Sequence, residues 1–337
     1  MSTDADPRTA GVSAVPDVPE TMLAALLDAP GAPESFRVDR HPVPATINSE
    51  YLVRVHATSV NPIETKTRSG RGVAAAIPHF PAILGNDFSG TIARAPFLAA
   101  PLQPGDEVYG MTFSPRYSGS YAEYVPAPAV LIARKPQSLS HAEAATVPLA
   151  ALTAWGIVAD IAEVRPGMRV LVHAGAGGVG HFAVQFAALR GAEVLATAGP
   201  NNQSFLRELG AATAIDYRSE RFEDIARDVD VVIDLIGNVH DDTGRRSLQT
   251  MRPGALLVNV PTGSWPGFAE EAAAAGMRAT DSKIIADARV LDEITALIDS
   301  GRLLVHVDRV LPLAEIAEAH RLSEEGHIRG KIAVSVP

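Results

Sequence analysis

The sequence predicts an α/β protein that joins a small all-β domain to a doubly wound parallel sheet. Its 337 residues are enough for about two domains of ~150 residues each. After about residue 152, the order of strand, glycine turn and helix repeats, which is typical of a parallel sheet covered by helices. Between about residues 21 and 148, short β-type runs are closely punctuated by Pro and Gly, as in a compact all-β domain.

The first part of the chain predicts a tail followed by short strands. Residues 1–20 are rich in Pro, Asp, Ser and Thr without an apolar period, so we expect a mobile tail. Alternation in YLVRVHA predicts a half-buried strand at 51–57, and two shorter runs predict strands at 106–109 and 129–133.

The second part predicts alternating strands and helices. The run 229–236 (VDVVIDLI) is apolar almost throughout, which is typical of a strand buried on both faces of a parallel sheet. The other expected strands are 169–173, 193–197, 255–260, 303–310 and 331–336, and the expected helices are 178–190, 204–209, 290–298 and 313–322.

Composition excludes several classes of protein. The formal net charge of −10 argues against nucleic acid or an anionic membrane as the main partner. The absence of cysteine excludes disulfides, thiolate nucleophiles and cysteine-ligated zinc. No apolar run reaches the ~18–20 residues that span a bilayer, and the N-terminus lacks a signal-peptide pattern. We therefore expect a soluble, cytosolic protein.

A glycine loop follows the first strand of the second part. The strand at 169–173 runs into Ala174-Gly-Ala-Gly-Gly-Val-Gly180, which contains G-x-G-x-x-G at Gly175, Gly177 and Gly180. Glycine permits the tight turn and a close approach of the backbone to a pyrophosphate, and the helix N-terminus favours its negative charge. With a strand before it and a helix after it, the motif predicts dinucleotide binding. The alternative is a turn that serves only helix–sheet packing.

The next strand indicates which dinucleotide is bound. NAD sites usually place Asp or Glu at its end to bind the ribose 2′-hydroxyl, but this strand ends in Ala196-Thr-Ala-Gly-Pro200. Because an acid would repel a 2′-phosphate, its absence favours NADPH. Arg207 and Arg218 are the nearest basic candidates, although each could equally be a solvated surface charge.

Several further segments resemble one family. In this order they are 59–68 (SVNPIETKTR), 84–90 (LGNDFSG), 105–110 (GDEVYG), 119–124 (GSYAEY), 152–155 (LTAW), the glycine loop, 210–217 (GAATAIDY) and 330–332 (GKI). Across roughly residues 35–337, they resemble the zinc-independent, quinone oxidoreductase-like branch (zeta-crystallin and enone reductases) of the medium-chain dehydrogenase/reductase superfamily.

The resemblance implies the domain organisation. It implies a GroES-like catalytic domain at 21–152 and 286–337, a Rossmann NADP(H)-binding domain at 153–285, an active site in the cleft between them, and a homodimer. Zinc-dependent relatives carry Gly-His-Glu where this chain has Gly-Asn-Asp at 85–87. None of the ten histidines has metal-site spacing, so we expect no catalytic metal.

The resemblance also implies the reaction. Without a metal to polarise an alcohol or carbonyl, we expect hydride transfer from NADPH to an activated C=C bond (enone or enoyl) or to a quinone. A tailoring enoyl or enone reductase of secondary metabolism and a weakly catalytic NADPH-binding protein are the alternatives.

Two residues are implied as catalytic. Asn61 matches the family position that faces nicotinamide and substrate, although Asn-Pro also favours a turn. Lys66 could donate a hydrogen bond or proton to a developing enolate if it is partly buried, or it could be a surface lysine.

The remaining candidates are cofactor contacts. Thr153 is a cofactor-contacting threonine or a helix N-cap, and Tyr217 lies against the adenosine end or packs in the core. Thr197 and Ala198 are expected to border the 2′-phosphate. The full set is Thr153, Ala174, Gly175, Gly177, Gly178, Val179, Gly180, Thr197, Ala198, Tyr217, Val260, Pro261 and Thr262, the last three near the nicotinamide because ligands bind at the carboxyl ends of parallel strands.

Acidic residues outside this set are expected to be structural. Asp87 and Glu123, with Tyr121, are expected to hold the β domain. Asp234 lies in a predicted buried strand and Asp241 opens a loop, so we reject a carboxylate pair for acid–base hydrolysis.

Overall fold

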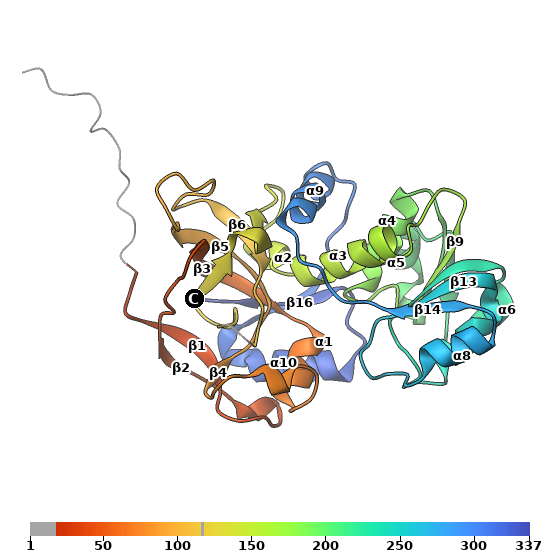
Figure 1. Cartoon of the computed structure of the whole chain (residues 1–337), viewed down its shortest axis with the longest axis horizontal. Helices are drawn as coiled ribbons and strands as arrows, with labels where there is room; N and C mark the ends of the chain where they lie inside the picture. The colour runs from red at the N-terminus through yellow and green to blue at the C-terminus, as the bar shows by residue number, and fades with distance from the viewer. Residues whose placement is uncertain (1–17, 116–117) are drawn as a thin grey trace, which may run out of the picture.

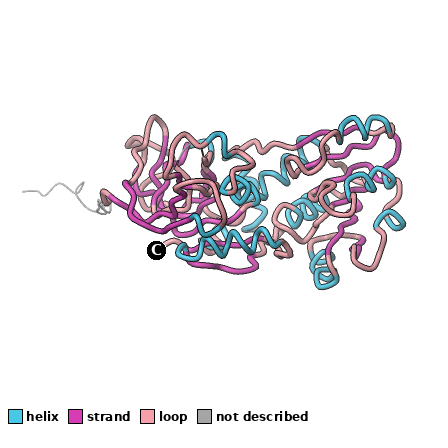
Figure 2. Tube along the Cα trace, turned by 90° about the horizontal axis from the view of Figure 1, so that it is seen from below, coloured by secondary structure: helices cyan, strands magenta, loops and turns pink. Residues whose placement is uncertain are grey.

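The computed structural model describes residues 18–115 and 118–337. Two domains lie side by side along the long axis of the molecule (Figures 1 and 2). We call them the β domain and the α/β domain. Most of the predicted tail, residues 1–17, lies outside the described residues.

The α/β domain contains a six-stranded sheet in which all neighbouring strands are parallel. Its order is β11 (Thr213–Asp216), β10 (Glu193–Ala198), β9 (Arg169–Val172), β12 (Val229–Asp234), β13 (Met251–Asn259) and β14 (Arg278–Asp281). In chain order this is 3-2-1-4-5-6, the arrangement of dinucleotide-binding sheets, and it reverses between β9 and β12. The helices between these strands are α4 (Gly180–Leu189), α5 (Gln203–Glu208), α6 (Phe222–Ile225), α7 (Thr243–Ser247) and α8 (Phe268–Ala274).

The β domain contains a larger and a smaller sheet. The larger has the order β15 (Val307–Pro312), β16 (Lys331–Ser335), β3 (Glu50–Val60), β5 (Asp87–Arg94), β6 (Glu107–Met111) and β8 (Ile132–Arg134), with β7 (Tyr124–Pro128) paired to β3. The smaller has the order β2 (Phe36–Pro42), β1 (Thr21–Leu27) and β4 (Ala82–Ile83). The helices of this domain are α1 (Pro62–Arg68), α2 (His141–Ala144) and α10 (Ile316–Glu325).

Two helices connect the domains. Helix α3 (Pro148–Trp155) leads out of the β domain, and α9 (Ala288–Asp299) leads back to it (Figure 1). The Tyr109 hydroxyl of β6 donates to the carbonyl oxygen of Leu291 in α9 at 2.8 Å, which anchors that helix on the β domain. The predicted boundary at 152/153 falls inside α3, and the one at 285/286 falls between β14 and α9. The domain limits themselves stay predictions.

Three sequence-predicted elements differ from the structure. The strand expected at 129–133 is a 3₁₀ turn (Ala129–Leu131) followed by β8, and the helix expected at 313–322 opens with a 3₁₀ turn before α10. The strand expected at 303–310 begins only at Val307. Its first residues are held instead by the Gln185 side chain, which accepts from the Leu304 N–H at 2.7 Å and donates to the Leu304 carbonyl at 3.0 Å.

Candidate cofactor and substrate site

The glycine loop turns from β9 into α4 at the carboxyl edge of the parallel sheet. The Gly175 N–H donates to the Thr197 carbonyl of β10 at 2.9 Å. A Cβ on Gly180 would stand 2.1 Å from the Ala174 carbonyl oxygen, so only glycine fits there. The turn therefore needs glycine for its own geometry.

The loop also suits an anionic group. Among the described residues, no hydrogen-bond partner is found for the N–H of Gly178 or Val179, just before the first turn of α4. Unpaired N–H groups at a helix N-terminus favour a phosphate. These residues fit the pyrophosphate of a dinucleotide.

Thr197 and Ala198, at the end of β10, lie next to the glycine loop. The Thr197 hydroxyl is 3.1 Å from His173 Nδ1 and accepts from the Ala174 N–H at 3.3 Å. Both Thr197 and Ala198 are buried, and the Ala198 carbonyl accepts from the Tyr217 N–H at 3.3 Å. The Thr197 hydroxyl therefore holds the loop, and contact of these two residues with a phosphate stays a prediction.

Tyr217 and Arg218 directly follow β11, beside the end of β10. Tyr217 is 51% exposed, so the alternative of core packing is wrong. A Cβ on Gly199 would lie 4.0 Å from Tyr217 Oη and 3.9 Å from Arg218 Nε. An aromatic ring and a guanidinium therefore lie close together where the sequence predicts that the adenosine end of the cofactor binds.

Sequence reasoning missed a third group here, Arg329. Its Nε donates to Asn202 Oδ1 at 2.7 Å, its Nη2 donates to the Asn201 carbonyl at 2.8 Å, and its guanidinium lies 5.2 Å from the centre of the Phe205 ring. No local pattern marks this arginine, because the residues that its guanidinium contacts lie more than a hundred positions earlier.

The other end of the predicted site lies where the two domains meet, and we call this place the junction. The segment 260–262 follows β13, and the carbonyl oxygen of Thr262 accepts from Lys66 Nζ of α1 at 3.3 Å. Lys66 is half-buried, and burial, then the like charge of Arg71, lowers the pKa of its ammonium. The structure thus brings Lys66 and Thr262 together from different domains.

Thr153 lies on α3, which also reaches the junction. Its hydroxyl donates to the Leu149 carbonyl at 2.7 Å, within the helix, and the residue is 9% exposed. The alternative of an N-cap is therefore wrong, because Thr153 lies in the last part of α3 rather than before its first turn.

Asn61 is the N-cap residue of α1 and is 2% exposed. Its Nδ2 donates to Asp87 Oδ2 at 2.9 Å and to Glu64 Oε1 at 3.3 Å, and its Oδ1 accepts from Lys331 Nζ. Since carboxylates only accept and an ammonium only donates, these partners define which way the amide faces. The side chain that the sequence assigns to catalysis is thus held on both sides.

Asp87 joins three elements at the same place. Its Oδ1 accepts from the Leu149 N–H in the first turn of α3 at 2.7 Å, and its Oδ2 accepts from Ser59 Oγ at 2.7 Å. The same Oδ2 lies 3.7 Å from Lys331 Nζ. These bonds fit the structural role predicted for Asp87. The contacts with Ser59 and Lys331 lie inside the β domain, and the bond to Leu149 reaches the junction.

Glu64 is fully buried beside Asp87. Its carboxylate accepts from the Asn61 N–H at 2.6 Å and the Asn86 N–H at 3.2 Å. Burial, and then the charge of Asp87, raises its pKa to about 7, against the opposing effect of Lys331. We call Glu64, Asn61, Asp87 and Lys331 the buried quartet.

Sequence reasoning did not assign a role to Glu64 or Lys331. One signal was present, because Lys331 directly precedes three apolar residues of its strand, in a chain with only four lysines. Such a charge is expected at the surface, and only the fold shows that it is 4% exposed.

The described ranges contain no group of three or more His, Asp or Glu side chains placed to hold a metal ion. The histidines beside the loop have other partners: His173 Nε2 lies 2.8 Å from Ser247 Oγ, and His181 Nδ1 lies 3.0 Å from the Gly177 carbonyl. Asp234 Oδ1 accepts the N–H groups of Ile236 and Gly237 at 2.9 and 2.8 Å, so this carboxylate shapes the turn after β12.

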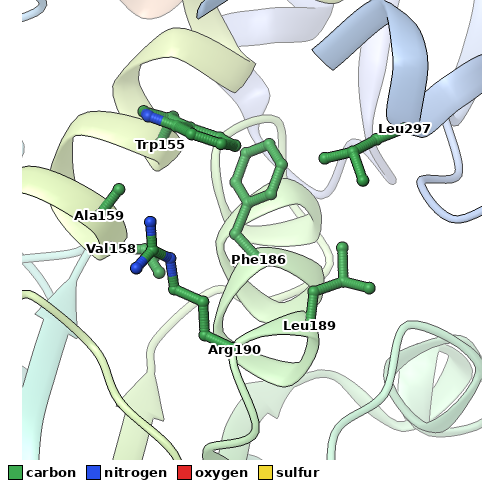
Figure 3. A pocket seen from close by; sticks show the side chains of 7 residues that line it. All are labelled: Trp155, Val158, Ala159, Phe186, Leu189, Arg190 and Leu297. Carbon is green, nitrogen blue, oxygen red and sulfur yellow. The ribbon is translucent and has the colours of Figure 1, made fainter. Parts of the chain in front are cut away.

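A separate apolar pocket of about 220 Å³ is lined by residues of α3, α4 and α9 (Figure 3). Trp155, Phe186 and Leu297 contribute its apolar wall, and Arg190 is its charged member. No residue of the glycine loop or the buried quartet lines it, so it is not the predicted cofactor site.

Two family models match the chain. Residues 48–137 match the alcohol dehydrogenase GroES-like domain, and residues 209–334 match a family described as zinc-binding dehydrogenase. The β domain is therefore GroES-like, and it accompanies a Rossmann-type α/β domain.

Individual relatives agree with this assignment. The chain is 30% identical to the mitochondrial NAD(P)H oxidoreductase RTN4IP1 of Danio rerio, covering 94% of this chain and 91% of the relative. It is 31% identical to the chloroplastic NADPH-dependent alkenal/one oxidoreductase of Arabidopsis thaliana, covering 96% and 82%. The solved quinone oxidoreductase of Coxiella burnetii superposes with a TM-score of 0.88 at 37% identity, covering 94% and 100%.

The prediction of a cytosolic protein is contradicted by these relatives, because the similar NAD(P)H oxidoreductases of Danio rerio, Mus musculus and Homo sapiens are named as mitochondrial. In the described part of the chain, no helix has both the length and the hydropathy that crossing a bilayer requires.

The glycine loop, the sheet order and relatives that align along nearly the whole chain lead to one assignment. The chain is an oxidoreductase that belongs to the medium-chain dehydrogenase/reductase superfamily, among its quinone oxidoreductase-like and enone reductase-like members.

Proposed function

We propose that this protein is an NADPH-dependent reductase that transfers a hydride to an activated C=C bond, as in an enone or enoyl group, or to a quinone. The observation that carries the proposal is the hydrogen bond between Lys66 and Thr262, which brings an ammonium to the carboxyl end of β13. In a sheet of this order, ligands bind at the carboxyl ends of the strands. The Arabidopsis relative, named as an NADPH-dependent alkenal/one oxidoreductase, supports the same chemistry.

The residues proposed to hold the cofactor follow the edge of the sheet. The glycine loop would receive the pyrophosphate, and Tyr217 with Arg218 would receive the adenosine 2′-phosphate, because a guanidinium pairs well with a phosphate. Thr153 and residues 260–262 would border the nicotinamide. When bound, NADPH supplies the hydride.

The chain's own task is to orient the acceptor and manage the charge that develops on it. A half-buried ammonium at Lys66 can donate a hydrogen bond to an enolate oxygen, which is worth more in a partly desolvated site than in water. Its lowered pKa also makes it a better proton donor near neutral pH. Asn61, held within the buried quartet, would support the nicotinamide side.

The alternatives differ in the acceptor or in turnover. A tailoring reductase would accept one narrow substrate class, whereas a weakly catalytic NADPH-binding protein would bind the cofactor without reducing any acceptor. A homodimer is also proposed, and light scattering of the purified protein tests it.

The deciding experiment is anaerobic incubation with NADPH and a panel of enones, an enoyl thioester and an ortho-quinone, followed by mass spectrometry of the products. A product heavier by two hydrogens is the expected result and identifies the acceptor class. Cofactor binding without any reduced product would contradict the proposed reaction and favour the NADPH-binding alternative.

A further inference from the structure

Lys331 connects the glycine loop to Asn61. The residue before it, Gly330, donates its N–H to the Ala176 carbonyl inside the loop at 2.8 Å. A Cβ on Gly178 would lie 3.0 Å from Lys331 Cδ, so the stem of the lysine crosses directly against the loop. From there Nζ reaches the Val60 carbonyl at 2.8 Å and Asn61 Oδ1.

The lysine is the cation of the buried quartet. Its side chain is 5% exposed and Asp87 is fully buried, so water screens neither charge appreciably. A charge at this depth is tolerated when it is paired and hydrogen-bonded, and Lys331 has two oxygen acceptors and a nearby carboxylate. The last strand of the chain thus places a lysine whose stem lies against the glycine loop and whose ammonium reaches Asn61.

Removing the ammonium would act on Asn61 first. Without the ammonium, Asn61 Oδ1 loses its donor and is left buried without a partner, so Asp87 and Glu64 hold the amide only from its Nδ2 side and its position is less well defined. The loop contact of Gly330 uses backbone atoms and would persist. A variant without the ammonium should therefore still bind the pyrophosphate but no longer place the nicotinamide correctly.

We propose that Lys331 is a positioning residue that acts through Asn61, holding the nicotinamide end of bound NADPH in register with the glycine loop. The inference rests on the proposed function for its cofactor, but not on the identity of the acceptor.

The test compares Lys331→Met, which keeps the length of the stem and removes the ammonium, with the wild-type protein. Three quantities are measured: the Kd of NADPH, the emission spectrum of the bound reduced nicotinamide, and kcat with an active acceptor. We expect a similar Kd, an emission spectrum shifted toward that of free NADPH, and a kcat lower by about 100-fold, as a misplaced reacting group can cause.

Two further variants separate positioning from folding. At pH 8, above the pKa of about 7 of Glu64, Lys331→Met/Glu64→Gln removes one buried charge of each sign, so it should regain thermal stability without regaining the emission spectrum or kcat. Lys135→Met is the matched control, because Lys135 is also a buried lysine, donating to the Leu139 carbonyl at 2.6 Å, but lies outside the junction. It should lower stability and leave the bound emission unchanged.

Each outcome decides between the two proposals. Wild-type emission and kcat in Lys331→Met would overturn the positioning role, and so would full recovery of both in the double variant, since that shows a purely structural effect. A wild-type protein that binds NADPH but reduces no acceptor would overturn the proposed reaction alone, and the emission comparison would still decide the role of Lys331. A wild-type protein that binds no nicotinamide cofactor would overturn both.

Discussion

Lys331 and Asn61 stand 270 positions apart in the sequence, and a hydrogen bond from Nζ to Oδ1 joins them in the interior. The bond connects the first residue of β16 to the residue that caps α1. Because both ends of the bond are buried, it compensates Asn61 Oδ1 for lost water, and it adds to the Val60 carbonyl and the nearby Asp87 carboxylate that compensate the Lys331 ammonium. The last strand therefore contributes one side chain to a buried quartet whose other three members lie within the first hundred residues.

Replacing Lys66 should slow turnover without weakening cofactor binding. Lys66→Met removes the ammonium that is proposed to face the acceptor, and general acid–base or hydrogen-bond assistance of this kind contributes about 10²–10⁴-fold. We expect kcat to fall by at least about 100-fold, while the Kd of NADPH stays similar. Lys283→Met, at an exposed lysine, is the control. Unchanged kcat in Lys66→Met would remove Lys66 from the mechanism.

Arg218 should determine the preference for NADPH over NADH. Its Nε lies beside the Gly199 position, where the 2′-phosphate is proposed to bind. A hydrogen bond to a charged group is worth about 1.5–3 kcal/mol, so Arg218→Ala should raise the Kd of NADPH by about 10–100-fold and leave that of NADH unchanged. Titration of cofactor fluorescence measures both constants. Arg207→Ala on α5 is the control, and equal effects of the two variants would contradict the assignment.

Glu64 should make stability fall as pH rises through the weakly acidic range. Burial raises its pKa from 4.5 to about 7 in the folded protein, so between these values the folded state holds a proton that the unfolded chain releases. The free energy of unfolding should therefore decrease from pH 4.5 to 7, by up to about 3 kcal/mol from this one group, and level off above.

Glu64→Gln should remove this contribution, because glutamine does not titrate. The measurement is the difference in unfolding free energy between variant and wild type, from denaturant titrations at pH 5 and pH 7.5. Glu293→Gln, at an exposed position of α9, is the control. A wild-type-minus-variant difference that does not change with pH would show that Glu64 is ionised throughout.

Gly180 should tolerate no side chain, unlike Gly156. A Cβ on Gly180 would lie 2.1 Å from the Ala174 carbonyl oxygen, whereas nothing lies within 4 Å of one on Gly156, which has helical dihedrals. Gly180→Ala should destabilise by about 1–3 kcal/mol and weaken NADPH binding, because the loop must move. Gly156→Ala should stabilise by about 0.4–1 kcal/mol. Thermal melts with and without NADPH check both, and a well-tolerated Gly180→Ala would mean that the loop can shift freely.

Local patterns in the sequence determined the parallel sheet and the glycine loop. The apolar runs that became β9, β12 and β13 are continuous in the chain, and the loop glycines lie within six positions of one another. Because backbone geometry and burial of this kind are decided by near neighbours, the pattern of residues is sufficient to predict them. The start of β15 was misplaced because a side chain 119 positions earlier, Gln185, binds Leu304.

Only the tertiary structure decided what surrounds the predicted catalytic residues. The motif identifies Asn61, but nothing in the sequence indicates that Lys331 is its partner. Arg329 likewise has no local signal, and only its contacts with residues 201 and 202 in the structure reveal it. The physical reason is that a charged side chain carries no local signal of burial. Whether it is solvated or paired depends on which distant segments pack over it, and that is decided by the folding of both domains against each other.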